Sequence, residues 1–96
     1  MEEVYGIAAF RSRQQVMAFE QLLTRAGIPA SIVSTPRSIS VGCGLSVRFE
    51  LRDAKVAWEV YRAARPGNLI GFFRVRYDGR GRVEVTPMGL ETGYHG

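Results

Sequence analysis

The apolar residues of this chain change their spacing along the sequence, and that change limits the folds the chain can adopt. Residues 45–51 alternate strictly, with apolar side chains at Leu45, Val47, Phe49 and Leu51 and polar ones at Ser46, Arg48 and Glu50. A period of two is typical of a β-strand that has one packed face and one face in water. Residues 11–26 instead place their apolar side chains on one stripe of a helix, at Val16, Phe19, Leu22, Leu23 and Ala26. Both periods in one short chain favour helices packed on a sheet.

The same patterns predict an order of elements along the whole chain. Strands are predicted at residues 4–10, 30–34, 45–51, 69–77 and 82–86, and helices at 11–26 and 53–64. Residues 78–81, with the sequence Asp-Gly-Arg-Gly, predict a hairpin turn between the last two strands. The order is βαββαβ with one further strand. It favours a ferredoxin-like α+β sandwich, with an antiparallel sheet, both helices on one face and an extra C-terminal hairpin strand.

Length and composition are those of one small globular domain. Residues 1–87 are predicted to form it, and residues 88–96, which hold three glycines and no periodic pattern, are expected to be a flexible tail. No run approaches the roughly 18 apolar residues of a membrane span, and the N-terminus does not resemble a signal peptide. We therefore expect a soluble, cytoplasmic protein with no membrane partner, either a monomer or a homodimer.

The chain lacks the residue clusters that most cofactor and metal chemistry requires. Its one histidine, His95, lies in the predicted tail, and no Cys, His, Asp or Glu cluster has metal-ligand spacing. Glycine-rich phosphate-binding motifs are absent as well. We expect no metal and no cofactor. One cysteine can form neither an internal disulfide nor a dithiol couple, so it is left with one-thiol chemistry.

That cysteine, Cys43, lies in the segment TPRSISVGCGLSVRF, residues 35–49. Gly42 and Gly44 leave room for a partner's sulfur to approach, and their N–H groups could form an anion-binding concavity that favours thiolate over thiol. Arg37 and Arg48 are close enough in sequence to add positive potential. The alternative is that Cys43 is a small buried apolar residue without a chemical role.

The segment resembles the selenium/sulfur carrier-like family, a group of small bacterial domains found alone or near sulfur- and selenium-handling proteins. Pro36-Arg37, Ser40, Cys43-Gly44 and the apolar strand 45–49 match the family pattern, and the resemblance covers about residues 4–64. It implies that Cys43 carries sulfur or selenium as a persulfide or selenopersulfide, received from a donor protein and passed to an acceptor enzyme. Arg37, Arg48, Gly42 and Gly44 would stabilise the thiolate. The resemblance implies a carrier without turnover of its own, although it leaves open whether the protein is an enzyme.

A second function is open to the arginine-rich strand 69–77. If Phe73 and Val75 point inward, then Phe72, Arg74 and Arg76 point outward and could dock nucleic acid or an acidic protein. The net charge of +4, with twelve arginines and one lysine, permits such binding. One aromatic residue among arginines is a weak motif, so we expect a solvated face and no nucleic-acid partner.

Overall fold

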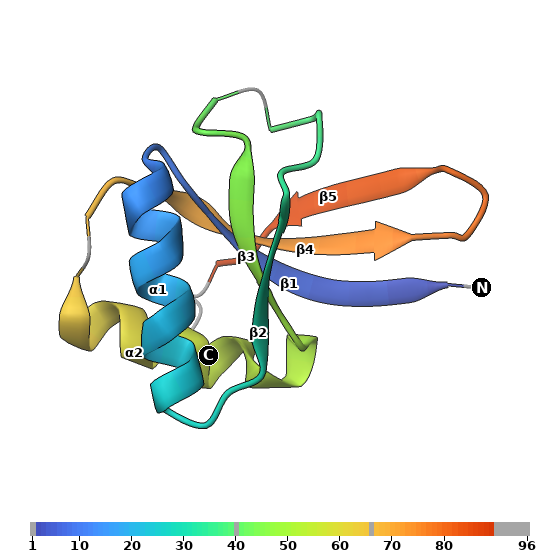
Figure 1. Cartoon of the computed structure of the whole chain (residues 1–96). Coiled ribbons are helices and arrows are strands. Elements are labelled where there is room, and N and C mark those ends of the chain that lie inside the picture. The colour runs from blue at the N-terminus through green and yellow to red at the C-terminus, as the bar shows by residue number, and fades with distance from the viewer. Residues whose placement is uncertain (1, 40, 66, 90–96) are drawn as a thin grey trace.

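The computed structural model describes residues 2–39, 41–65 and 67–89. In chain order its elements are β1 (Glu3–Phe10), α1 (Arg13–Arg25), β2 (Ala30–Ser34), β3 (Leu45–Phe49), the short 3₁₀ helix η1 (Leu51–Asp53), α2 (Ala54–Ala64), β4 (Leu69–Tyr77) and β5 (Val83–Pro87). The strands form one antiparallel sheet in the order β2-β3-β1-β4-β5 (Figure 1). The predicted α+β class, with an antiparallel sheet and two α-helices, is confirmed.

The central strand β1 fixes which residues share a face of the sheet. Ile7 pairs with Arg48 of β3 on one side and with Phe73 of β4 on the other, so these three side chains lie on one face. Ala8 pairs with Val47 and Phe72, which lie on the other. Figure 1 shows that the β4–β5 hairpin reaches beyond the two helices, while β2 and β3 lie close to α1.

The main core lies on the face that both helices cover. Val16, Phe19 and Leu23 of α1 and Ala57 of α2 join Ala8, Phe10, Val47, Phe49 and Phe72 of the sheet in one buried cluster. Phe72 is near its centre, with its ring 5.3 to 6.1 Å from the rings of Trp58, Phe49, Phe19 and Tyr61. Such tilted and edge-on aromatic pairs add to the energy of burial. We call this side the helix face.

The opposite side of the sheet, which we call the open face, is less exposed to solvent than the alternating pattern predicts. Ile7, Ala9, Ser46 and Val75 lie on this face, and each is at most 1% exposed. The Ser46 hydroxyl is hydrogen-bonded to Thr35 Oγ1, with 2.7 Å between the oxygens. The segment after β2 therefore folds back over part of the open face and excludes water from it.

Several predicted boundaries move by one or two residues. The alternating strand ends at Phe49 rather than Leu51, because Asp53 N–H donates to the Glu50 carbonyl at 2.8 Å and the chain turns into η1. The last strand ends at Pro87, and Met88 N–H then donates to the Phe72 carbonyl at 2.9 Å. Since the Met88 side chain also packs on the core, the expected tail does not begin at residue 88. Residues 90–96 of that tail lie outside the described residues.

Candidate functional site

The loop between β2 and β3 is closed at its base by hydrogen bonds. Thr35 N–H donates to the Gly44 carbonyl at 2.9 Å, and the Thr35 hydroxyl meets Ser46 across the same junction. Further out, Ile39 N–H donates to the Pro36 carbonyl at 3.0 Å, which makes residues 36–39 a turn with Arg37 at its second position. Both ends of the loop are thus held to the sheet, and the Pro-Arg pair is presented at a bend.

Cys43 lies at the foot of this loop, against the end of the central strand. Its N–H donates to the Phe10 carbonyl at 3.3 Å, and its thiol donates to the Leu45 carbonyl at 3.6 Å. The side chain is a free thiol, partly exposed, that packs on the rim of the helix-face core. The backbone of Cys43 is therefore fixed while part of its sulfur stays within reach of solvent.

The two positions beside the thiol require glycine for different structural reasons. Both have positive φ, +105° at Gly42 and +86° at Gly44, which disfavours any other residue. A Cβ on Gly42 would lie 2.6 Å from Ile70 Cδ1 and 2.8 Å from the Phe10 carbonyl oxygen, whereas a Cβ on Gly44 would meet nothing within 4 Å. Gly42 thus lets the loop approach β1, and Gly44 only allows a bend. That their N–H groups favour the thiolate stays a prediction.

Arg48 does not stand beside the thiol. Its guanidinium lies over the Tyr5 ring, 3.9 Å from the ring centre, and its Nη1 is 3.7 Å from Glu3 Oε1. Both contacts are on the open face, whereas Cys43 packs toward the helix face. Within β3, Arg48 pairs with Ile7 and so points to the open face. These contacts do not support the predicted contribution of Arg48 to the stability of the Cys43 thiolate.

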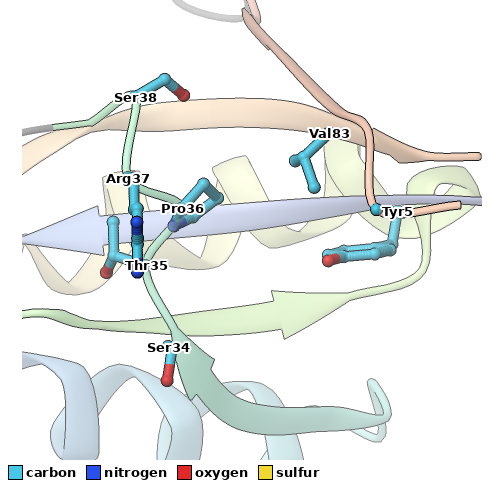
Figure 2. A pocket seen from close by; sticks show the side chains of 8 residues that line it. Tyr5, Ser34, Thr35, Pro36, Arg37, Ser38 and Val83 are labelled. Atoms are coloured by element: carbon cyan, nitrogen blue, oxygen red, sulfur yellow. The ribbon is translucent and has the colours of Figure 1, made fainter.

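Arg37 also belongs to the open face. It is exposed and lines a depression there together with Tyr5 (Figure 2). Arg48 thus contacts Tyr5, and Arg37 lines the same depression as that tyrosine. Tyr5 was not a candidate on sequence grounds, because its neighbours depend on the register between β1 and β3. A contribution of Arg37 to thiolate stability stays a prediction.

The predicted docking face on β4 needs a correction. Phe72 is 4% exposed and is part of the core, because β4 turns Phe72 rather than Phe73 toward the helices. Arg74 and Arg76 are exposed, as expected. Arg76 binds the carboxylates of Glu2 and Glu84, and the bond to Glu2 raises the pKa of its guanidinium further. One of the two arginines expected to dock a partner is therefore paired within the chain.

The described residues hold no group of three or more His, Cys, Asp or Glu side chains placed to bind a metal ion. Among them, no helix has the length and apolar character needed to cross a membrane.

The fold and the loop define a small α+β domain with a single, partly accessible thiol held between two glycines. A comparison with protein families matches residues 5–65 to the family described as "Putative Se/S carrier protein-like", and the chain belongs to that family. The matched range contains the whole Cys43 loop and ends before the β4–β5 hairpin. No curated protein and no solved structure matches the chain.

Proposed function

We propose that the protein carries one sulfur or selenium atom on Cys43 and transfers it between a donor and an acceptor protein. The observation that carries the proposal is the place of the only cysteine in the family-matched range: in a fixed loop, partly exposed and with no side chain on either neighbour. The single thiol limits the chemistry to a bound atom rather than an internal disulfide.

The transfer needs no external oxidant. Cys43 first loses its proton to solvent, which also releases the sulfur from the Leu45 carbonyl. The thiolate then attacks the terminal sulfur of a donor persulfide, the S–S bond of the donor breaks, and the donor cysteine leaves as a thiolate. Delivery repeats the exchange, since an acceptor thiolate attacks the terminal atom and Cys43 leaves. Selenium would follow the same route as a selenopersulfide.

The surroundings of Cys43 suit the approach of a second protein. Gly42 and Gly44 are exposed and present backbone alone, so a partner's sulfur would meet no side chain from either neighbour. The hydrogen bond from Cys43 N–H to the Phe10 carbonyl fixes the backbone that carries the thiol, which reduces the ordering needed in the complex. A cytoplasmic location accords with a thiol that must stay reduced between cycles.

We also propose that β1 to β4 with the two helices form a ferredoxin-like unit. Support comes from the order β2-β3-β1-β4 within the sheet and from the packing of both helices on one face. The strand β5 would then be an addition to that unit.

Intact-mass spectrometry tests the carrier function. The protein, purified without reductant, is incubated with a polysulfide donor, desalted and weighed beside the Cys43→Ser variant. We expect the mass of one added sulfur atom on the wild type, its removal by dithiothreitol, and no gain in the variant. Equal gains in both proteins, or none in the folded wild type, would contradict the proposal.

A further inference from the structure

The open face has a depression of about 670 Å³ that the thiol chemistry does not use. It lies between the segment 34–38 and the β4–β5 hairpin and is lined by Tyr5, Ser34, Thr35, Pro36, Arg37, Ser38, Gly81 and Val83 (Figure 2). A volume of this size is within the range of small-molecule sites. Gly81 and Val83 lie beyond residues 5–65, so the depression is completed by a part of the chain outside the family match.

The depression is lined by one charged side chain. Among the described residues that line it, Arg37 is charged and none is acidic. On the opposite rim, Gly81 is flanked by Arg80 and Arg82, both exposed. The nearby carboxylate of Asp78 is occupied, because its Oδ1 accepts hydrogen bonds from the N–H groups of Arg80 and Arg82 at 2.7 and 3.1 Å. The cation that an anion in the depression would meet is therefore Arg37.

The walls are partly apolar. The Tyr5 ring is covered on one side by the Arg48 guanidinium, which holds the ring in place. Val83 is 47% exposed and faces the depression with Pro36. In Figure 2 the Tyr5 ring points toward the segment 34–38. Such a site has one cation and an aromatic surface.

We propose that this depression binds a small organic oxyanion, with its anionic group on Arg37 and its apolar body against Tyr5 and Val83. Arginine suits this task because its planar donors match the oxygens of a phosphate or a carboxylate. Arg37 is available for it, whereas Arg48 and Arg76 are already paired with carboxylates of the same chain. The proposal does not depend on Cys43, which packs toward the helix face.

The test is a titration of the full chain with phenyl phosphate, followed by amide NMR shifts. We expect saturable shifts at residues 34–38, 5 and 81–83, and affinity lowered roughly tenfold or more in Arg37→Gln, since a charge-assisted hydrogen bond is lost. Arg13→Gln, which removes an exposed arginine from the start of α1, is the matched control and should bind as the wild type does. Circular dichroism of both variants checks that they are folded.

Titrations with other variants and ligands define the chemistry of the ligand. Tyr5→Leu should weaken phenyl phosphate and leave inorganic phosphate unchanged, and benzoate separates carboxylate from phosphate binding. Cys43→Ser should bind like the wild type, so failure of the carrier function would not count against this site. Equal weakening in Arg37→Gln and Arg13→Gln, or shifts that do not saturate, would overturn the proposal and indicate attraction to the net charge alone.

Discussion

The two faces of the sheet are built from alternate residues of the same strands, yet they differ in almost every property. The helix face is filled by aromatic rings from both helices and the sheet, and the one thiol lies at its rim. The open face combines buried aliphatic residues near β1 with arginines, a tyrosine and a depression at its surface. The strand period sets the face of each strand residue, while Arg37 and Cys43 come from the loop between β2 and β3.

This division changes how the motif around the cysteine is understood. In the sequence, Arg37, Cys43 and Arg48 look like one cluster. In the structure Cys43 bonds to Phe10 through its N–H and to Leu45 through its thiol, while Arg48 lies over Tyr5 and Arg37 lines the same depression as Tyr5. Proximity along the sequence does not imply proximity in space. The two faces can therefore serve separate functions, and the following experiments test that separation.

The largest effect is expected from truncating two neighbouring phenylalanines. Phe72→Ala should lower the free energy of unfolding by about 3–5 kcal/mol, because it opens a cavity among four aromatic rings on the helix face. Phe73→Ala should cost less than half as much, since Phe73 is partly exposed on the open face and water can fill the space. Urea unfolding of both variants measures the difference. Equal losses would contradict the assignment of the two faces.

The strand β4 shows which parts of the fold can be predicted from the sequence. The limits of β4, 69–77, are as predicted, because its apolar run is bounded by turn residues on both sides. Which of Phe72 and Phe73 is buried could not be predicted, since both parities of LIGFFRVRY carry apolar residues and the register with β1 decides. Cys43 and its glycines could be found from the loop composition. The contact of Arg48 with Tyr5 could not be predicted, because it joins two residues 43 positions apart in the chain.

A second pair of variants examines the loop. Gly42→Ala should destabilise the protein by roughly 2–4 kcal/mol, because alanine disfavours the positive φ of this position and its Cβ would collide with Ile70 and the Phe10 carbonyl. Gly44→Ala has the backbone strain without the collision and should cost about 1–2 kcal/mol. Thermal unfolding compares the two. If Gly42→Ala is the milder change, the loop is not anchored to β1 as described.

A smaller effect is expected at Arg48. Arg48→Ala should reduce stability by at most about 1 kcal/mol, the usual range for an exposed ion pair and a surface cation–π contact. Since Arg48 lies on the face opposite Cys43, the rate of alkylation of Cys43 by iodoacetamide should stay within about twofold of the wild-type rate. A much slower rate in the variant would show that Arg48 does assist the thiol and would remove the separation of the faces.

The smallest effect concerns the hairpin turn. Hydrogen bonds from the N–H groups of Arg80 and Arg82 lower the pKa of Asp78 below its usual 3.8. A carboxyl group with a lowered pKa in the folded state stabilises the fold above pH 3.8, and this contribution is lost as pH falls through the lowered value. Urea unfolding between pH 5 and pH 2 should therefore show a slightly steeper loss in the wild type than in Asp78→Ala. Parallel curves would contradict the role of Asp78 in the turn.

The central claim is that Cys43, in the folded protein, both accepts and releases a chalcogen atom. Cold cyanolysis measures this directly, because cyanide takes the terminal sulfur of a persulfide and leaves as thiocyanate. The native protein is loaded with polysulfide, desalted and treated with cyanide beside Cys43→Ser. We expect the release of close to one thiocyanate per wild-type chain and of none from the variant. Release from the wild type no greater than from Cys43→Ser, or release only after unfolding, would contradict it.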